Sequence, residues 1–113
     1  MDMFDPLKPA AFHILLALAE RDLHGYAVMQ SVRQNSGGSV PLQTGSFYRH
    51  LSRLIDEGFV IEAAAPKGPR EDIDPRRGTY YRLTPRGRQV LANEQTRLSS
   101  LVAHMKKLKL SAK

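Results

Sequence analysis

Residues 44–63 read TGSFYRHLSRLIDEGFVIEA, and this stretch decides the fold. Up to Gly58 its apolar residues recur at helical spacing, so the sequence predicts a helix with Thr44 as its N-cap. After Gly58 the run Phe59–Ala63 is rich in β-prone side chains and predicts a strand. The elements on either side of this helix and strand then determine the architecture.

Two further helices are predicted before this stretch. Pro9 stands where a helix begins, and apolar residues follow it at three- and four-residue spacing as far as Ala19. After a break over residues 22–25, a second helix is predicted from about Gly25 to Asn35, since glycines at 37 and 38 supply a stop. Residues 39–43 contain a proline and predict a turn.

The region after the central stretch predicts a second strand and a long last helix. Thr79–Leu83 is β-prone, and residues 64–78 before it are interrupted by Pro and Gly, which predicts a hairpin loop or wing. Thr84 followed by Pro85 predicts a helix start, and the chain runs from Arg88 to Lys113 without Pro or Gly. The predicted class is mainly α with a small β-hairpin: a winged helix-turn-helix domain over residues 1–83 and a C-terminal helix for dimerisation over 84–113.

Composition narrows the possible environments and chemistries. A chain of 113 residues has room for one compact domain and a modest core. It has no cysteine, which excludes disulfides, thiolate nucleophiles and zinc sites that need Cys. The start is acidic where a secretory signal is basic, and the longest clean apolar run, Ile14–Ala19, is too short to cross a bilayer. We expect a cytoplasmic protein without membrane contact.

Positive charge is concentrated in the second part of the chain. Residues 1–43 hold three Lys/Arg and four Asp/Glu, a net −1, whereas residues 44–113 hold fourteen and seven, a net +7. Such an excess is typical of a protein that binds a polyanion. An ordinary soluble surface that happens to be basic is the alternative.

The third helix and the wing carry the candidate DNA contacts. Arg49 or Arg53 could bond guanine O6 and N7 together, and Ser46 near the helix start suits a phosphate. The alternative for this polar side is an ordinary solvated helix face. The basic residues of the wing would neutralise phosphates, with a solvated hairpin tip as the alternative. The candidates are Thr44, Ser46, Arg49, His50 and Arg53 on the helix and Lys67, Arg70, Arg76 and Arg77 in the wing.

The last helix carries an apolar row that could pair with a second copy. Leu91 is expected to pack on the chain's own core, and Glu94 falls where a continuous row would need an apolar residue. Helix one or the N-terminal segment is therefore expected to join the interface. A dimer would present two third helices to two half-sites about one turn of DNA apart. The predicted dimerisation residues are Leu98, Leu101, Val102, Met105 and Leu108.

The chain resembles the short class of the PadR family of bacterial transcriptional regulators over nearly its whole length. The marks are LHGY at residues 23–26, GSFY at 45–48 with leucines at 51 and 54 and glycine at 58, and YYRLT at 80–84 with glycine at 87. No single mark is specific, but their order and spacing together are. Phe47 and Arg49 depart from the family pattern, which has leucine and often proline there, and this puts the target sequence in doubt.

The resemblance implies a homodimer that binds double-stranded DNA, usually as a repressor, and that in some members is released by a small aromatic or drug-like ligand. Tyr48 would touch a phosphate at the groove edge or help to close the core. The resemblance also suggests an effector pocket at Phe12, Leu98, Val102 and Met105, with core packing of these residues as the alternative.

Other functions are less well supported by the residues. The four histidines show no metal-ligand spacing, and His24 is expected to bond locally at a helix start. Ser46 lacks the surroundings of a hydrolase nucleophile, so we expect no enzymatic activity, metal or cofactor. The rival from another class is a winged-helix module for protein contacts that uses the apolar C-terminal row. RNA binding is weaker, because it needs exposed strand aromatics and strand alternation buries Tyr80 or Tyr81.

Overall fold

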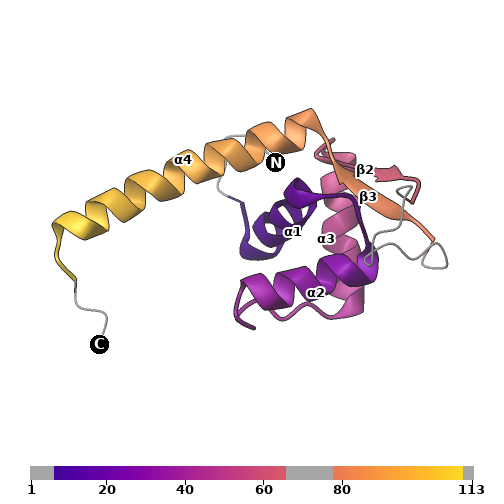
Figure 1. Cartoon of the computed structure of the whole chain (residues 1–113), viewed down its shortest axis with the longest axis horizontal. Helices are drawn as coiled ribbons and strands as arrows, with labels where there is room; N and C mark the ends of the chain where they lie inside the picture. The colour runs from indigo at the N-terminus through magenta and orange to yellow at the C-terminus, as the bar shows by residue number, and fades with distance from the viewer. Residues whose placement is uncertain (1–6, 66–77, 111–113) are drawn as a thin grey trace.

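The computed structural model describes residues 7–65 and 78–110. Within them lie four helices and three short strands (Figure 1), and all of them except the strand at residues 23–24 follow in the predicted order. The predicted winged helix-turn-helix class, mainly helical with a small sheet, is confirmed. The elements are α1 (Pro9–Glu20), β1 (Leu23–His24), α2 (Gly25–Asn35), α3 (Thr44–Asp56), β2 (Val60–Ala63), β3 (Tyr80–Leu83) and α4 (Pro85–Lys107).

The sheet is three-stranded and antiparallel, with the order β1-β3-β2. In the register, Leu23 lies opposite Tyr81 on one side of β3, and Val60 lies opposite Leu83 on the other. The sequence predicted only the hairpin of β2 and β3 and took residues 22–25 as a break. A two-residue strand has no visible alternation, and β1 exists only because it pairs with residues far along the chain.

Both tyrosines of β3 are buried, although they lie on opposite faces of the strand. Tyr81 shares its face with Leu83 and belongs to the hydrophobic core. Tyr80 packs edge-on against His24, with ring centroids 5.4 Å apart. Neither ring is an exposed platform on which a base could stack, so the surface that RNA recognition would need is missing from β3.

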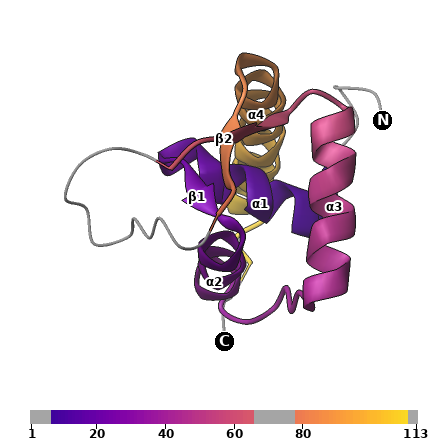
Figure 2. The same cartoon turned by 90° about the vertical axis from the view of Figure 1, so that its right-hand side faces the viewer.

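Helix α1 is the centre of the core. It packs against α2, α3, α4 and β3 (Figure 1), and its residues Ile14, Leu15 and Ala17 have no exposed surface. Figure 2, turned by 90°, shows α3 to the right of α1, α2 below it and α4 above it. The apolar spacing that predicted α1 therefore reflects burial against three other helices and a strand.

The first turn of α4 is bonded to the turn that follows α3. Thr84 is the predicted N-cap: its Oγ1 accepts from the Gly87 N–H at 3.0 Å and donates to the Gly58 carbonyl at 2.6 Å. The Thr84 N–H donates to the Phe59 carbonyl at 3.0 Å, and Arg86 Nε donates to the Glu57 carbonyl at 3.1 Å. We call these two segments, residues 57–59 and 84–87, the α3–α4 joint.

Helix α4 is held to the N-terminal segment by a buried carboxylate. Glu94 is 5% exposed and accepts from the Leu7 N–H at 3.0 Å and from Arg97 Nε at 2.5 Å. The hydrogen bond from Arg97 lowers the pKa of Glu94, and the Leu7 N–H acts in the same direction while burial opposes both. Glu94 thus faces the body of the domain, which explains an acidic residue among apolar neighbours.

Beyond Glu94, α4 leaves the body and ends earlier than predicted. Figure 1 shows its second half extending past α1. The last helical residue is Lys107, Leu108 is the C-cap, and Lys109 takes a left-handed φ of 52°. The prediction of a helix continuing from residue 88 to 113 without a break is wrong in this respect. Neither Gly nor Pro stands at the end of α4, so no stop signal could be recognised there.

Candidate nucleic-acid interface

Helix α3 has one buried and one polar side. Phe47, Leu51 and Leu54 are buried, whereas Arg49 and Arg53 are exposed on the outer side. Ser46 and His50, which complete the predicted polar side, are half-buried. The division between the two sides is the one expected from the spacing of the residues, and it leaves two guanidinium groups on the surface of a helix that is anchored to the core.

The start of α3 differs from the prediction. Thr44 was expected to be the N-cap, but it is the first helical residue, and Gln43 occupies the cap position without a side-chain hydrogen bond. The extended backbone at Gln43, with φ −78° and ψ 156°, moves the cap one residue earlier. Thr44 is exposed, and its contact with DNA stays a prediction.

Two of the candidate contacts are bonded to each other. Arg49 Nη2 donates to Ser46 Oγ at 3.2 Å, one turn apart on the exposed side of α3. This bond draws the Arg49 side chain back along the helix toward its N-terminus. The two groups present a single donor-rich patch at the surface.

His50 lies in a strongly cationic environment. Burial lowers its pKa from the ordinary 6.5, and Arg49, Arg53 and Lys8 lower it further by repulsion. The imidazole is therefore neutral at pH 7. A neutral imidazole can donate one hydrogen bond and accept another, and it takes up a proton when an anion approaches.

Tyr48 is a surface residue that leans on α2. Its side chain is 46% exposed, and its ring meets the Phe47 ring edge-on with centroids 4.9 Å apart. A Cβ atom added to Gly25 would lie 2.7 Å from the Tyr48 hydroxyl oxygen. Tyr48 is thus half exposed while it packs on Phe47 and over Gly25, and its contact with a phosphate stays a prediction.

A small polar cavity, here called the tyrosine pocket, lies where the two family-like segments at residues 23–26 and 45–48 meet. Its volume is about 230 Å³, and its described lining consists of His24, Gly25, Tyr26, Tyr48, Thr79 and Tyr81. His24 makes the predicted local bond, its Nδ1 accepting from the Ala27 N–H at 3.2 Å. Sequence reasoning missed the pocket, because β1 was not predicted and β1 is what brings the start of α2 beside β3.

The basic residues predicted for the wing, Lys67, Arg70, Arg76 and Arg77, lie outside the described residues. The strands on either side of the wing pair in register, with Ala63 opposite Tyr80. Of the two described strands of the hairpin, β3 pairs with β1, and β2 lies at the outer edge of the sheet.

The predicted dimerisation residues are exposed in the single chain. Leu101, Val102 and Met105 on α4 are about half exposed, at 47%, 49% and 51%, and Leu98 lies at the boundary with 36%. Leu108 is exposed too, but as the C-cap it lies beyond the helix proper. An apolar row of this length without a cover is unusual on the surface of a small domain.

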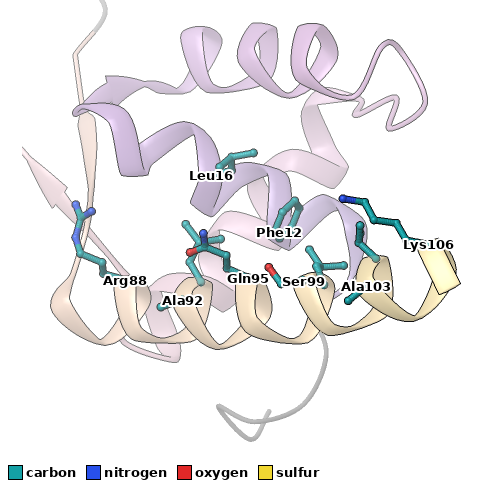
Figure 3. A pocket seen from close by; sticks show the side chains of 11 residues that line it. Phe12, Leu16, Arg88, Ala92, Gln95, Ser99, Ala103 and Lys106 are labelled. Carbon is teal, nitrogen blue, oxygen red and sulfur yellow. The ribbon is translucent and has the colours of Figure 1, made fainter.

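A groove of about 730 Å³ runs between α1 and α4. Figure 3 shows Phe12 and Leu16 of α1 pointing toward α4, with Ser99 and Lys106 along the opposite wall. Of the residues proposed for an effector pocket, Phe12, Leu98 and Val102 line the groove and Met105 does not. The lining is Phe12, Leu16, Arg88, Leu91, Ala92, Gln95, Leu98, Ser99, Val102, Ala103 and Lys106.

Two further features are absent from residues 7–65 and 78–110. No three His, Asp or Glu side chains come together there in a way that could hold a metal ion. In the same residues, no helix combines the length and the apolar character that crossing a bilayer requires.

Comparison with known proteins gives a family match and many structural matches. The model of the transcriptional regulator PadR-like family matches residues 14–93. A search of curated proteins gave no significant match.

Solved structures with the same fold include several transcriptional regulators. A PadR family transcription regulator from Clostridium difficile is 19% identical with a TM-score of 0.69, and the match covers 91% of this chain and 100% of that one. A transcriptional regulator from Clostridium thermocellum is 21% identical with a TM-score of 0.64 and 87% coverage of both chains. Bacillus subtilis PadR, solved in complex with operator DNA, is 24% identical with a TM-score of 0.58, and 76% of this chain matches 46% of that one.

Proposed function

Because the chain belongs to the PadR-like family of transcriptional regulators, we propose that it represses transcription as a homodimer that binds double-stranded DNA sequence-specifically in the cytoplasm. The family consists of regulators, which agrees with the expectation that the chain is not an enzyme. The proposal goes further than the family in naming the surface, the assembly and the direction of the effect.

The exposed side of α3 is the observation that carries the proposal. Arg49 and Arg53 extend from a helix whose other side is fixed by the buried Phe47, Leu51 and Leu54. In a helix-turn-helix motif, the second helix of the motif, here α3, enters the major groove. An arginine on that helix can bond both acceptors of one guanine. We assign base reading to Arg49 and Arg53 and backbone contacts to Thr44, Ser46, Tyr48 and His50.

The wing supplies further phosphate contacts in this proposal. Its four basic residues, Lys67, Arg70, Arg76 and Arg77, lie in the sequence between β2, which packs on α3, and β3, which pairs with β1. Contacts of this kind raise affinity for every duplex and carry no sequence information. They position α3 in the groove, and α3 reads the bases.

Dimerisation through α4 follows from its exposed apolar row. Leu98, Leu101, Val102 and Met105 are exposed in the single chain although a second copy of the same helix could cover them. A symmetric pair would bring two α3 helices to one side of a palindromic site. The Bacillus subtilis relative, solved on operator DNA, supports this mode of action.

Release by a small aromatic effector is the last part of the proposal. The groove between α1 and α4 is lined by Phe12, Leu98 and Val102 and joins the surface that we assign to the dimer. A planar apolar compound there would contact both elements and alter how they pack. A panel of such compounds should raise the melting temperature of the protein for at least one member, and no shift with any member would contradict effector binding.

A protein-contact module is the second candidate, favoured by the same apolar row on α4. In that case α4 would bind a different protein, and the arginines of α3 would be solvated. The two candidates differ in what happens with DNA. A dimer that contacts about 6 to 10 phosphates loses affinity steeply as salt rises, whereas a protein-contact module has no such affinity to lose.

Selection of preferred duplexes from a random pool tests the proposal directly. We expect an enriched palindromic sequence, bound by two chains, with an affinity that falls as salt is added. Sequence-independent binding of a single chain would contradict the proposal, as would failure to bind any duplex in dilute buffer. Repression is checked by placing the selected site downstream of a promoter and comparing transcription with and without the protein.

A further inference from the structure

The three carbonyl groups that follow α3 all accept hydrogen bonds from the start of α4. Gly58 takes a left-handed φ of 81°, and the N–H groups of Gly58 and Phe59 donate back into the last turn of α3 at 3.0 and 2.9 Å. This Schellman motif closes α3 with the N–H groups of the turn and leaves the carbonyls of residues 57–59 available. Those carbonyls accept from Thr84 and Arg86. The end of α3 is therefore bonded to α4 at three consecutive residues.

Arg86 makes the bond that lies nearest to α3. Its Nε donates to the Glu57 carbonyl at 3.1 Å, and its guanidinium carbon lies 5.5 Å from the centre of the Phe59 ring. A Cβ added to Gly58 would meet Arg86 Cδ at 3.5 Å. A guanidinium at this place also faces the negative end of the α3 dipole. One side chain of α4 thus covers all three residues of the turn.

The close contact at Gly87 and the hydrogen bond of Arg86 restrict different motions of α4. Gly87 lies directly against the Phe59 carbonyl, with no room for a Cβ between them, so the two helices cannot come closer there. A single contact of this kind still allows α4 to rotate about it. Thr84 bonds close to that contact, whereas Arg86 bonds to Glu57, two residues further toward α3. Arg86 is therefore placed to resist rotation of α4 against α3.

The core of the domain does not depend on Arg86. Its side chain is exposed, while Gly87 and Val90 of the same helix are buried against the body. One exposed hydrogen bond and one exposed contact with an aromatic ring contribute little to the free energy of folding. The effect of Arg86 therefore falls on the angle between the two helices and not on whether the domain folds.

We propose that Arg86 fixes the angle between α3 and α4 and thereby sets the spacing of half-sites that a pair of chains accepts. This inference rests on the proposed function, in which α4 joins two chains and each α3 reads one half-site. One added base pair moves the second half-site by about 3.4 Å along the duplex and turns it by about 35°. A rigid joint cannot follow that change, whereas a more mobile joint lets each α3 follow part of it. Arg86 is thus a positioning residue that selects operator length without a contact to DNA.

The experiment uses the duplex obtained by selection and versions of it with one base pair added or removed between the half-sites. Wild-type protein should bind both altered duplexes on the order of 100-fold more weakly, because only one α3 can then enter its groove. Arg86→Ala should lose a smaller factor, on the order of 10-fold, and its melting temperature should stay close to the wild-type value. Wild-type protein that accepts every spacing equally would overturn the inference.

Arg88→Ala is the matched control, since Arg88 is an exposed arginine two residues further along α4 that lines the groove toward α1. It removes the same charge and should keep the wild-type loss on the altered duplexes. An Arg86→Ala protein with the wild-type loss overturns the inference, and so does an Arg88→Ala protein that matches Arg86→Ala. These results leave the proposed function intact, because wild-type protein still binds the selected duplex. If wild-type protein binds no duplex, both are overturned.

A distance measurement tests the joint without DNA. The chain has no cysteine, so nitroxide labels can be attached through Ser52→Cys on α3 and Thr96→Cys on α4, both at exposed positions. An excess of unlabelled protein leaves one labelled chain in each pair. Arg86→Ala should broaden the distribution of distances between the two labels, and Arg88→Ala should leave it unchanged. Equal widths for wild type and Arg86→Ala overturn the inference.

Discussion

Gly87 packs so closely on Phe59 that a Cβ atom added to the glycine would overlap the Phe59 carbonyl oxygen and lie 2.7 Å from a methyl group of Leu83. The Phe59 carbonyl already accepts from the Thr84 N–H, and the Phe59 ring lies under the Arg86 guanidinium at 5.5 Å. The first turn of α4 therefore has no space to shift relative to the end of α3. Gly87 is one of the marks of the family resemblance, and the lack of space for a side chain explains why a glycine stands there.

The first prediction concerns this contact. Gly87→Ala should lower the free energy of unfolding by about 3 kcal/mol or more, because the methyl group would meet backbone that cannot move away. Gly45→Ala is the control, since nothing lies within 4 Å of its Cβ position on α3. It should be neutral or stabilise by roughly 0.5–1 kcal/mol. Chemical denaturation at one fixed protein concentration measures both, and equal effects would contradict this account of the joint.

The stability of the folded protein should depend on pH because of Glu94. Its pKa in the folded protein lies below the ordinary 4.5, chiefly because Arg97 donates to it. The stabilisation is therefore fully present above about pH 4.5 and is lost as the pH falls through the folded pKa. Glu94→Gln should be less stable than wild type at pH 7, and the gap should narrow as the pH is lowered toward 3. Thermal unfolding across this range tests the sign, and a gap independent of pH would contradict it.

If α3 reads bases, replacing its arginines should lower DNA affinity by an amount that depends on the DNA sequence. Arg49→Ala or Arg53→Ala should cost about 1 to 3 kcal/mol on the selected duplex and relax the preference at one base pair. Arg76→Ala and Arg77→Ala in the wing should weaken binding to all duplexes alike. Fluorescence anisotropy on selected and random duplexes distinguishes the two classes. If the variants of α3 and of the wing behave identically, the assignment of base reading to α3 is wrong.

The apolar row of α4 predicts an assembly that a single charge disrupts. Leu101→Glu should turn the dimer into a monomer, since it places a carboxylate in the middle of the row, and Leu101 is exposed enough for the domain to stay folded. Thr96→Glu adds the same charge at an exposed polar position of the same helix and should leave the dimer intact. Analytical ultracentrifugation measures the assembly. DNA affinity should fall at least about 10-fold for the monomer, because two half-sites are no longer bound together.

His50 predicts a pH dependence of DNA binding. In the free protein its pKa is held below 6.5 by burial and by Arg49, Arg53 and Lys8. Nearby phosphates would raise that pKa in the complex, so the complex binds a proton that the free protein does not. Affinity should therefore rise as the pH falls from 7 toward the pKa of the free protein, and His50→Gln should remove this dependence. Equal pH profiles for wild type and His50→Gln would exclude His50 from the interface.

The helices were predictable because each has a repeated spacing over three turns or more. The bounds of α2, from Gly25 to Asn35, agree with the prediction, since glycines mark its end and a polar break its beginning. Thr84 could be recognised as a cap because a proline follows it. In all of these, the signal lies within a few residues of the feature.

Features that depend on distant parts of the chain could not be predicted. The strand β1 is only two residues long and is defined by its pairing with β3. The carboxylate of Glu94 interrupted an apolar pattern. No neighbouring residue in the sequence indicated its hydrogen bond to Leu7, which is 87 residues away in the chain. The tyrosine pocket depends on the same kind of long-range pairing. Sequence spacing indicated which side of α3 faces outward, but not what lies beside it.

The rigid α3–α4 joint has a consequence for the distance between the two α3 helices in a pair of chains. Helix α4 has 23 residues and is therefore a rod of about 35 Å. Because the joint fixes the base of this rod to α3, a tilt of the rod by about 5° about its far end would carry the joint, and α3 with it, through roughly 3 Å. A compound that separates α1 from α4 would change the tilt of this rod. The two α3 helices of a pair would then no longer be spaced by one turn of DNA and could not both enter the major groove.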